Sequence, residues 1–265
     1  MASKQTILVI ALALAGCAGP AQRTRNSEND TFDEVNVRLN AWTPAADVRL
    51  NADGQPSNVT GSSGKLDTSI GDAFDLGEMA FNGSVEMWEG ETAYIIRGQY
   101  IDMSDRSGSG ATSSSTHLRD DTIDLLVSQR FDLEENPDEL PSMTAELMGG
   151  ARYRSANVKA NVPTAPRGSQ AHDWVEAVIG ARFIKPATED LEFELSGDMS
   201  GFNIGSGSKL TWNAFGGANW QFNPSNGLRL GWQVYDVDWG RGGGASETSI
   251  NGQFSGPILG WQFNF

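Results

Sequence analysis

The last nine residues of the chain, P-I-L-G-W-Q-F-N-F, alternate between large apolar and small or polar side chains. In an extended strand the odd positions from Pro257 to Phe265 share one apolar face, and the even positions share the other face. This period of two predicts a β-strand with one apolar face. An unpaired edge strand of this kind invites aggregation, and closure of the sheet into a barrel removes the edge. The last strand of a soluble sandwich or soluble barrel is the alternative.

Nine further segments repeat this alternation, with their apolar residues on one parity. The pattern predicts ten strands, at residues 35–43, 79–87, 94–100, 123–130, 143–154, 175–183, 191–199, 210–222, 228–235 and 257–265. Residues 47–70 predict an additional hairpin that projects out of the membrane. If this hairpin or a weak segment is misassigned, the number of strands becomes eight or twelve. With 31 Gly and only 20% charged residues, the composition suits many strands joined by turns.

The lengths of the connections indicate an orientation in a membrane. No run approaches the roughly 18–20 apolar residues that a membrane helix needs, so membrane residence requires a barrel or an anchor. The expected connections are short at 88–91, 134–141, 185–190 and 223–227, and mostly longer at 47–70, 104–116, 157–170, 201–208 and 240–248. Short periplasmic turns and longer outer loops are typical of bacterial outer-membrane barrels. We therefore predict a single closed antiparallel transmembrane β-barrel at residues 33–265, with both termini in the periplasm.

Several motifs carry a family resemblance. They are V-I-G-A-R-F at 178–183, G-D-M-S-G-F-N-I-G-S at 197–206, L-G-W-Q-V-Y-D-V-D-W at 230–239 and F-S-G-P-I-L-G-W-Q-F-N-F at 254–265. In these motifs, residues 174–265 resemble a widespread group of small, mostly uncharacterised Gram-negative outer-membrane β-barrel proteins. The resemblance implies the fold and the bacterial outer membrane as location, and it implies little about activity.

The chain end also resembles the recognition signal of outer-membrane barrels, a terminal Phe preceded at steps of two by apolar or aromatic residues. The resemblance implies that the barrel-assembly machinery binds the final strand through Leu259, Trp261, Phe263 and Phe265.

The N-terminus resembles an export signal. Lys4 precedes an apolar run at 7–15, which is too short to span a bilayer. L-A-G-C at 14–17 resembles a bacterial lipobox, in which Cys17, the only Cys of the chain, becomes acylated. We predict a signal peptide at 1–17, with ordinary cleavage near residues 13–21 as the alternative. Residues 18–32 are polar and poor in apolar side chains, and predict a disordered periplasmic tether.

The polar parity predicts a lumen that is filled with ion pairs. Its cations are all Arg, whose forked guanidinium suits pairing with carboxylates of neighbouring strands. The predicted lumen residues are Arg38, Glu78, Glu86, Arg97, Asp124, Arg130, Glu146, Arg152, Arg154, Glu176, Arg182, Glu192, Glu194, Asp198 and Arg229. An open aqueous channel takes about 16–18 strands. We therefore favour a structural or surface-interaction role with a largely plugged lumen, and a narrow channel for small solutes is the alternative.

Signals for catalysis are weak. His117 lies near Asp120 and Asp121, and His172 adjoins Asp173, all near the predicted outer rim. Omptin proteases are ten-stranded barrels that use Asp and His there, but no omptin motif is present. A rim-located protease or lipid-modifying hydrolase is the second alternative, and we predict that the chain is not an enzyme.

Other ligand classes have little support in the sequence. Zinc-ligand spacing, a phosphate-binding glycine loop and a nucleophile elbow are absent from the sequence, so we expect neither a metal nor a cofactor. The net charge of -15 argues against nucleic acid as a partner. The expected partners are outer-membrane lipid and the assembly machinery, and the sequence does not identify a small-molecule ligand.

Overall fold

The computed structural model describes residues 32–52, 62–69, 71, 80–107, 114–133, 143–161, 168–203, 209–241 and 248–265. Most of these residues lie in strands: β1 (Glu34–Trp42), β2 (Ala45–Ala52), β3 (Ser62–Thr68), β4 (Ala80–Glu89), β5 (Thr92–Ser107), β6 (Ser114–Asp132), β7 (Thr144–Asn161), β8 (Gly168–Pro186), β9 (Leu191–Ser200), β10 (Leu210–Asn223), β11 (Asn226–Arg241) and β12 (Thr248–Asn264). Within the described ranges, no helix has the length and apolarity needed to cross a membrane. The predicted signal peptide, the tether up to residue 31 and Glu78 lie outside the described residues.

Ten of these strands, β1 and β4–β12, form a closed antiparallel barrel. Each strand from β4 to β11 pairs with the next, and β1 closes the ring by pairing with both β4 and β12. At the seam, Val37 of β1 lies opposite Val85 on one side and Phe263 on the other. The prediction of ten strands is confirmed.

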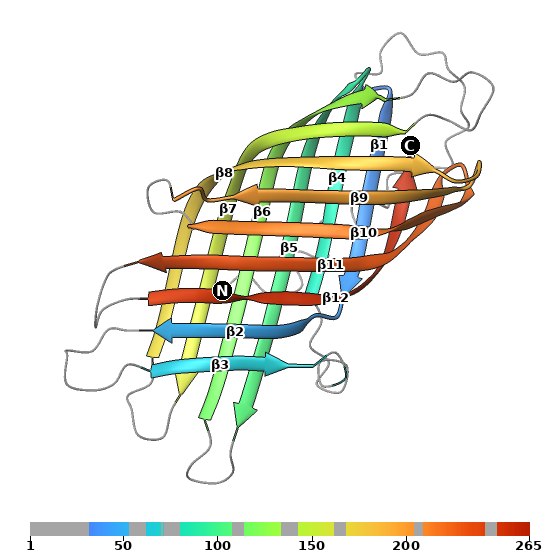
Figure 1. The fold of residues 1–265 in the computed structure, drawn as a ribbon. Coiled ribbons are helices and arrows are strands. Elements are labelled where there is room, and N and C mark those ends of the chain that lie inside the picture. Colours follow the sequence, from blue (N-terminus) through green and yellow to red (C-terminus); the bar gives the residue numbers. More distant parts are fainter. Residues whose placement is uncertain are drawn as a thin grey trace.

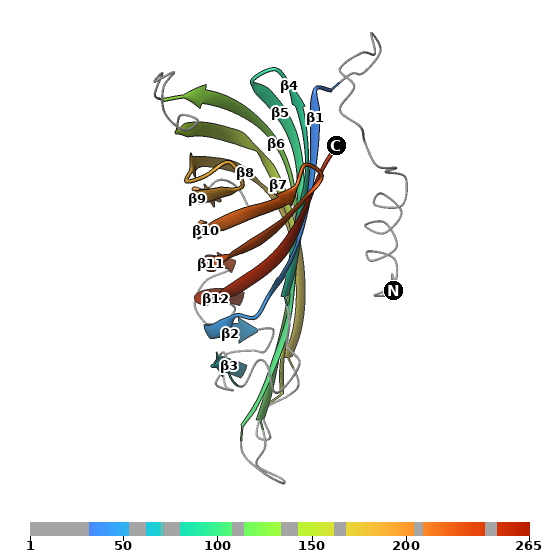
Figure 2. The same cartoon turned by 90° about the vertical axis from the view of Figure 1, so that its right-hand side faces the viewer.

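The hairpin predicted at 47–70 is present as β2 and β3. Beyond Thr43 and Pro44, β2 continues the path of β1 and pairs with the first half of β12, while β3 pairs with β2. Ala46 and Val48 of β2 are only 3% and 0% exposed, so this hairpin belongs to the packed structure. Figures 1 and 2 show β9–β12, β2 and β3 in one layer that crosses a second layer formed by β4–β7.

Several connections are shorter than the sequence predicts. The Gly- and Ser-rich composition of residues 104–116 predicts a loop, yet β5 continues to Ser107 and β6 begins at Ser114. The loops predicted at 157–170 and 240–248 are shortened in the same way by β7, β8, β11 and β12. Strand propensity depends on packing against neighbouring strands, and cross-strand pairing outweighs the weak local preference here.

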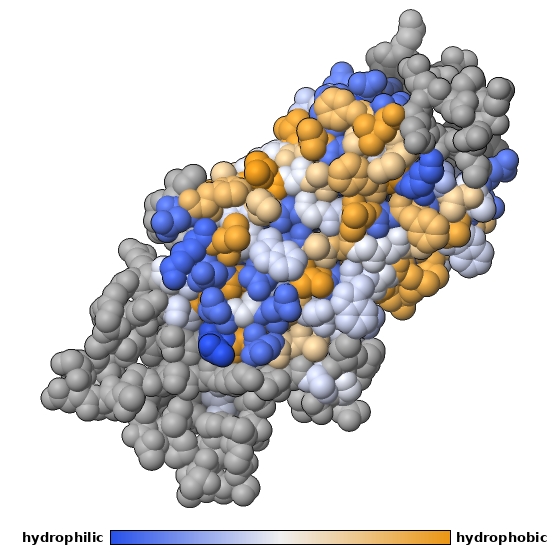
Figure 3. Space-filling model, viewed as in Figure 1, coloured by the Kyte–Doolittle hydropathy of each residue, from blue (hydrophilic) through white to orange (hydrophobic). Residues whose placement is uncertain are grey.

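A belt of apolar side chains covers the outside of the barrel near the end where β1 begins and β12 ends. Val175, Leu195 and Leu125 are typical, with 63%, 61% and 59% of their surfaces exposed. Figure 3 shows hydrophobic residues gathered toward the upper right, where β1 begins, and hydrophilic residues gathered toward the lower left. Aliphatic and aromatic side chains with this degree of exposure match a lipid-facing band.

Toward the end with the longer connections, the two faces of the strands exchange their character. On β11 the side chains of Tyr235, Val237 and Trp239 are buried inside, whereas Asp236 and Asp238 lie on the opposite parity. On β6, Leu118 is buried inside and His117 and Arg119 face out. The projecting part of the barrel is therefore built like a soluble β-sandwich, with an apolar interior and a polar exterior.

Candidate functional site

The barrel lumen at the level of the belt collects the charged side chains of the inner parity. Apart from Glu78, all predicted lumen residues lie on inward-facing strand positions. Those that are buried are Arg38, Glu86, Asp124, Glu146, Arg152, Arg154, Glu176, Arg182, Glu194, Asp198 and Arg229. Arg97, Arg130 and Glu192 are partly exposed. Their contacts form four groups that together cross the lumen.

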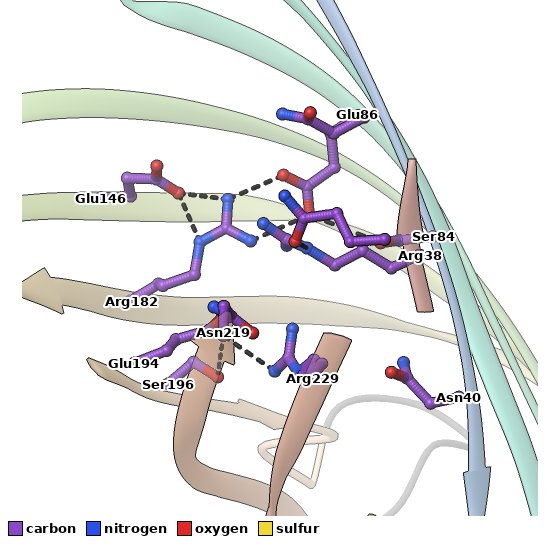
Figure 4. A network of polar contacts seen from close by, with 12 residues as sticks. Arg38, Asn40, Ser84, Glu86, Glu146, Arg182, Glu194, Ser196, Asn219 and Arg229 are labelled. Atoms are coloured by element: carbon purple, nitrogen blue, oxygen red, sulfur yellow. Dashed lines mark hydrogen bonds and ion pairs between the residues drawn. The ribbon is translucent and has the colours of Figure 1, made fainter. Parts of the chain in front are cut away.

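The first group is centred on Arg182 of β8 (Figure 4). Its Nη2 lies 2.9 Å from Oε2 of Glu86 on β4, and its Nε donates to Oε2 of Glu146 on β7 at 2.6 Å. Arg38 Nη1 on β1 lies 2.6 Å from the other oxygen of Glu86. Arg130 Nη2 lies 3.2 Å from Glu146. Because β4 and β8 are not neighbours in the ring, the Arg182–Glu86 pair spans the lumen.

The second group is a closed ring of four charges. Arg97 contacts Asp124 at 2.6 Å and Asp198 at 2.9 Å. Arg152 contacts the same two carboxylates at 2.7 Å and 2.9 Å. Each charge therefore has two partners of opposite sign, on β5, β6, β7 and β9. This ring connects opposite walls of the barrel.

The third group contains a carboxylate that sequence reasoning assigned to the rim. Asp120 is only 1% exposed and accepts two hydrogen bonds from Arg154, at 2.7 Å and 2.6 Å. The hydroxyl of Tyr235 donates to the same carboxylate at 3.1 Å, and Arg154 also donates to Thr211 at 3.2 Å. The signal that could have revealed this position is parity, because Asp120 has the same parity on β6 as Asp124.

The fourth group lies on β9–β11. Arg229 Nη2 lies 2.9 Å from Glu194, and its guanidinium carbon lies 3.8 Å from the ring centre of Phe215. The amide of Asn219 donates to both Glu192, at 3.0 Å, and Glu194, at 3.1 Å. Phe215 in turn packs over the inner face of β10 and β11, where Gly217 and Gly231 leave room for its ring.

A chain of side-chain amides also crosses the lumen, and the charge pattern of the sequence did not predict it. Asn40 donates to Asn82 at 2.7 Å, Asn82 to Gln233 at 3.0 Å, and Gln233 to Gln99 at 3.2 Å. The chain runs from β1 and β4 across to β11 and back to β5. Between these polar groups the lumen keeps a cavity of about 90 Å³.

Apolar side chains fill the remainder of the interior, which corrects the expectation of a purely polar filling. In the projecting half, Trp42, Trp239, Phe254 and Ile250 are each 0–2% exposed and belong to one apolar cluster. A smaller cluster around Trp88 lies toward the short-turn end, where Arg130 packs 3.7 Å above the Trp88 ring. Tryptophan on the inner parity gave no sequence signal, because alternation alone does not distinguish a lumen from a dry core.

The predicted rim residues do not assemble into one site. His117 faces outward and contacts Asp102 at 2.8 Å, and Asp121 pairs with Arg119 at 2.9 Å on the same face. Asp120 lies on the opposite, inner face. His172 packs against Trp239, with ring centres 5.0 Å apart, while the neighbouring Asp173 is exposed. In the described ranges, no three His, Cys, Asp or Glu side chains are placed to hold a metal ion.

Of the four residues of the expected assembly signal, three lie on the outer face of β12, and Phe265 follows the end of that strand. Leu259, Trp261 and Phe265 are 53%, 41% and 39% exposed. Phe263 lies between two of them, with its ring centre 6.3 Å from Trp261 and 6.5 Å from Phe265. Cys17 lies outside the described residues.

A closed ten-stranded antiparallel barrel with an apolar outer belt and an ion-paired lumen defines the class of outer-membrane β-barrel proteins. Among solved structures, the chain is similar to the outer membrane protease OmpT from Escherichia coli, with 12% identity, a TM-score of 0.52, and 91% of this chain and 100% of that chain covered. At this identity the likeness shows the fold alone. The chain has the fold of bacterial outer-membrane β-barrel proteins.

Two other solved structures are more distant. The translocator domain of the autotransporter NalP from Neisseria meningitidis matches with 11% identity, a TM-score of 0.42 and coverage of 98% of both chains. The attachment invasion locus protein Ail of Yersinia pestis matches with 11% identity, a TM-score of 0.38, and 88% of this chain and 98% of that chain covered. No protein-family model and no curated protein sequence matches the chain.

Proposed function

We propose that this protein has a structural or surface-interaction role, carried by the part that projects beyond the apolar belt, and that its lumen does not conduct. The observation that supports the proposal is the double filling of the interior. Ion pairs such as Arg182–Glu86 cross the lumen at the level of the belt, and an apolar cluster around Trp42 and Phe254 fills the projecting half.

The size of the cavity in the lumen supports a closed barrel. A cavity of about 90 Å³ is much smaller than the about 300–1,000 Å³ of a typical ligand pocket. Hydrated solutes that pass through porins need a continuous aqueous path, which barrels of about 16–18 strands provide. A path through this barrel would first require ion pairs and packed aromatic rings to separate.

Planar-bilayer recording tests the closed lumen. We expect no discrete ohmic steps from the wild-type protein. The combined variant Arg182→Ala/Glu86→Ala/Trp42→Ala/Phe254→Ala truncates both fillings, and it serves as the open reference because its conductance should rise. Discrete steps from the wild-type protein, comparable to those of the reference, would support the alternative function, a narrow channel for small solutes.

Surface labelling tests where the projecting part lies. In whole cells, a membrane-impermeant maleimide should label Asp238→Cys on the outer face of β11 and should not label Asn223→Cys at the end of β10, beside the short turn. The parent chain, which contains only Cys17, provides the blank. Labelling of Asn223→Cys without labelling of Asp238→Cys would contradict the proposed orientation and the surface role.

We also propose that the protein is not an enzyme. His117 and Asp120 lie on opposite faces of β6, and Asp120 is held by Arg154, which supports this view. The variant His117→Ala/Asp121→Ala changes only outward-facing residues and should leave every phenotype unchanged. Loss of peptide or lipid hydrolysis in this variant would favour the second alternative, a rim-located hydrolase.

Lipid anchoring through Cys17 is a further part of the proposal. It is supported by the lipobox-like L-A-G-C at 14–17. Cells that express the protein should incorporate labelled palmitate into it, and Cys17→Ala should abolish the incorporation. Equal labelling of both proteins would refute acylation at Cys17.

A further inference from the structure

The apolar belt ends at the same level on the neighbouring strands β6 and β7. Ile123 and Tyr153 lie directly opposite each other there, and they are 52% and 44% exposed. The outward positions described beyond them are all polar or charged: Ser115, His117, Arg119 and Asp121 on β6, and Ser155, Asn157 and Lys159 on β7. This polar surface is therefore continuous with the lipid-facing belt, at the level where lipid head groups begin.

Two permanent cations of this surface are close enough to act together. Arg119 lies opposite Asn157, and Lys159 is the next outward residue along β7, so the two cations occupy diagonal positions of the sheet. Diagonal neighbours in an antiparallel pair are about 7–8 Å apart, within reach of long side chains. One anionic group can therefore contact both cations.

The two cations have donors that the protein leaves available. Arg119 Nε donates to Asp121 at 2.9 Å, and no described residue accepts from its two Nη groups. The ring of Tyr100 lies 5.1 Å from the guanidinium carbon and packs beside it. Lys159 is exposed and forms no ion pair with a described residue. Phosphate oxygens are acceptors that suit a guanidinium and an ammonium group.

A carboxylate beside the cations indicates a ligand that also carries hydroxyl groups. Asp102 of β5 lies opposite Arg119, and its side chain is 23% exposed. A carboxylate repels a bare phosphate ion, but it accepts hydrogen bonds from hydroxyl groups. The combination of guanidinium, ammonium and carboxylate therefore fits a sugar that carries phosphate.

The height of the two cations favours a head group that is larger than that of a phospholipid. Arg119 is four residues beyond Ile123, and Lys159 is six residues beyond Tyr153. At about 3.3 Å per residue and a strand tilt of about 35–45°, their Cα atoms lie about 10 Å and about 15 Å above the belt. The head-group layer of a bilayer is only about 5–8 Å thick on each side. A phospholipid phosphate therefore meets at most Arg119, whereas a phosphorylated sugar reaches both cations.

We propose that Arg119 and Lys159 bind the phosphorylated sugar head group of a glycolipid in the outer leaflet, whose acyl chains lie against the belt below. The Nη groups of Arg119 and the ammonium of Lys159 donate to phosphate, and Asp102 accepts from a sugar hydroxyl. This inference deepens the proposed surface role and rests on its orientation, with the projecting part outside the cell.

Native mass spectrometry of the purified protein in a non-ionic detergent tests the site. Lipid A, an acylated and phosphorylated disaccharide, is the probe and should bind the wild-type protein. Each Lys or Arg near anionic lipid contributes about 1 kcal/mol, or about fivefold in affinity. The variant Arg119→Met/Lys159→Met should therefore raise the apparent Kd for lipid A about 30-fold.

Arg49→Met/Lys209→Met is the matched control. It also removes one exposed Arg and one exposed Lys from the projecting part, but these residues lie on β2 and beside β10, which are not neighbours. The control should bind lipid A like the wild-type protein. A loss of affinity in the control equal to that of Arg119→Met/Lys159→Met would show a diffuse charge effect and overturn the inference.

Phosphatidylglycerol, an anionic lipid with a small head group, should bind at least about tenfold more weakly than lipid A. Equal binding of the two lipids, or an unchanged affinity for lipid A in Arg119→Met/Lys159→Met, would also overturn the inference. These measurements in detergent are independent of the orientation, which the labelling of Asp238→Cys tests. If that labelling succeeds and lipid A does not bind, the inference fails and the proposed function stands.

Discussion

Removal of Arg154 should be among the most destabilising single changes in the barrel. Its guanidinium donates two hydrogen bonds to Asp120, at 2.7 Å and 2.6 Å, and one to Thr211 at 3.2 Å. It also packs against the rings of Trp174 and Tyr235, with its central carbon 5.3 Å and 5.5 Å from their centres. Arg154→Met retains much of the apolar volume and leaves Asp120 with a single described donor, the hydroxyl of Tyr235.

The expected cost follows from the charge that remains behind. The side chains of Arg154 and Asp120 are each 1% exposed, so water does not replace the lost partner. Removing one member of a buried ion pair typically costs about 3–5 kcal/mol, whereas replacing both members with apolar groups is often neutral or stabilising. We therefore expect a loss of about 3–5 kcal/mol for Arg154→Met, a similar loss for Asp120→Leu, and recovery of most of the loss in the double variant.

Reversible urea unfolding in lipid vesicles, followed by tryptophan fluorescence, measures these free energies. The coupling energy from the double-mutant cycle should be several kcal/mol. Arg119→Met is the matched control, because its partner Asp121 is partly exposed, and it should cost less than about 1 kcal/mol. The reasoning is refuted if both single variants cost less than about 1 kcal/mol, or if the double variant loses as much as the sum of the two.

Three further predictions concern the outer belt, the inner glycines and the last residue. Leu125 lies on the belt and is 59% exposed, so Leu125→Arg should lower the unfolding free energy by about 2–4 kcal/mol in the same assay. Asp173→Arg, beyond the belt, should lower it by less than about 1 kcal/mol. Equal losses would contradict the assigned belt. Gly231→Ala should cost about 1–3 kcal/mol, because the added Cβ would lie 2.5 Å from the ring of Phe215, and Gly98→Ala, whose Cβ would meet nothing closer than 3.9 Å, should be nearly neutral. Phe265→Ala keeps the backbone hydrogen bonds with Val35, at 3.1 Å and 2.9 Å, so it should lower assembly in cells without changing the unfolding free energy of the purified protein; an equal loss in both assays would argue against a role in recognition.

The ring of ten strands could be predicted because lipid imposes a simple rule on the outside of a barrel. Whatever its partner, an outward side chain such as Leu125 or Leu195 must be apolar, so each strand carries its own signal. The exchange of apolar and polar faces beyond Tyr235 could also be read from the sequence, because Asp236 and Asp238 stand at positions that are apolar earlier in the strand. The full length of β5 and β6 was not, because their Gly- and Ser-rich ends are held by pairing between strands.

The sequence could not show which charged side chains pair with one another inside the lumen. Arg182 binds Glu86 from a strand that is not its neighbour, and the choice depends on the width of the barrel. The apolar core of the projecting half could not be predicted for a related reason. Trp42 and Trp239 lie on the parity that faces water in an open lumen. Asp120 was misplaced because its sequence neighbours His117 and Asp121 suggested a rim site, although an odd and an even position of one strand face opposite ways.

The exchange of faces along strands such as β6 and β11 fixes the immersion depth of the protein. On β6, Asp121 and Ile123 are successive outward positions, and strands advance about 3.3 Å per residue. A displacement by two residues along the strand, about 6.6 Å, would bring the Asp121 carboxylate into hydrocarbon or lift Ile123 into water, and the same penalty would recur on β11 between Val234 and Asp236. A bilayer that is too thin or too thick would therefore have to deform around the protein, because the protein cannot shift to a second immersion depth.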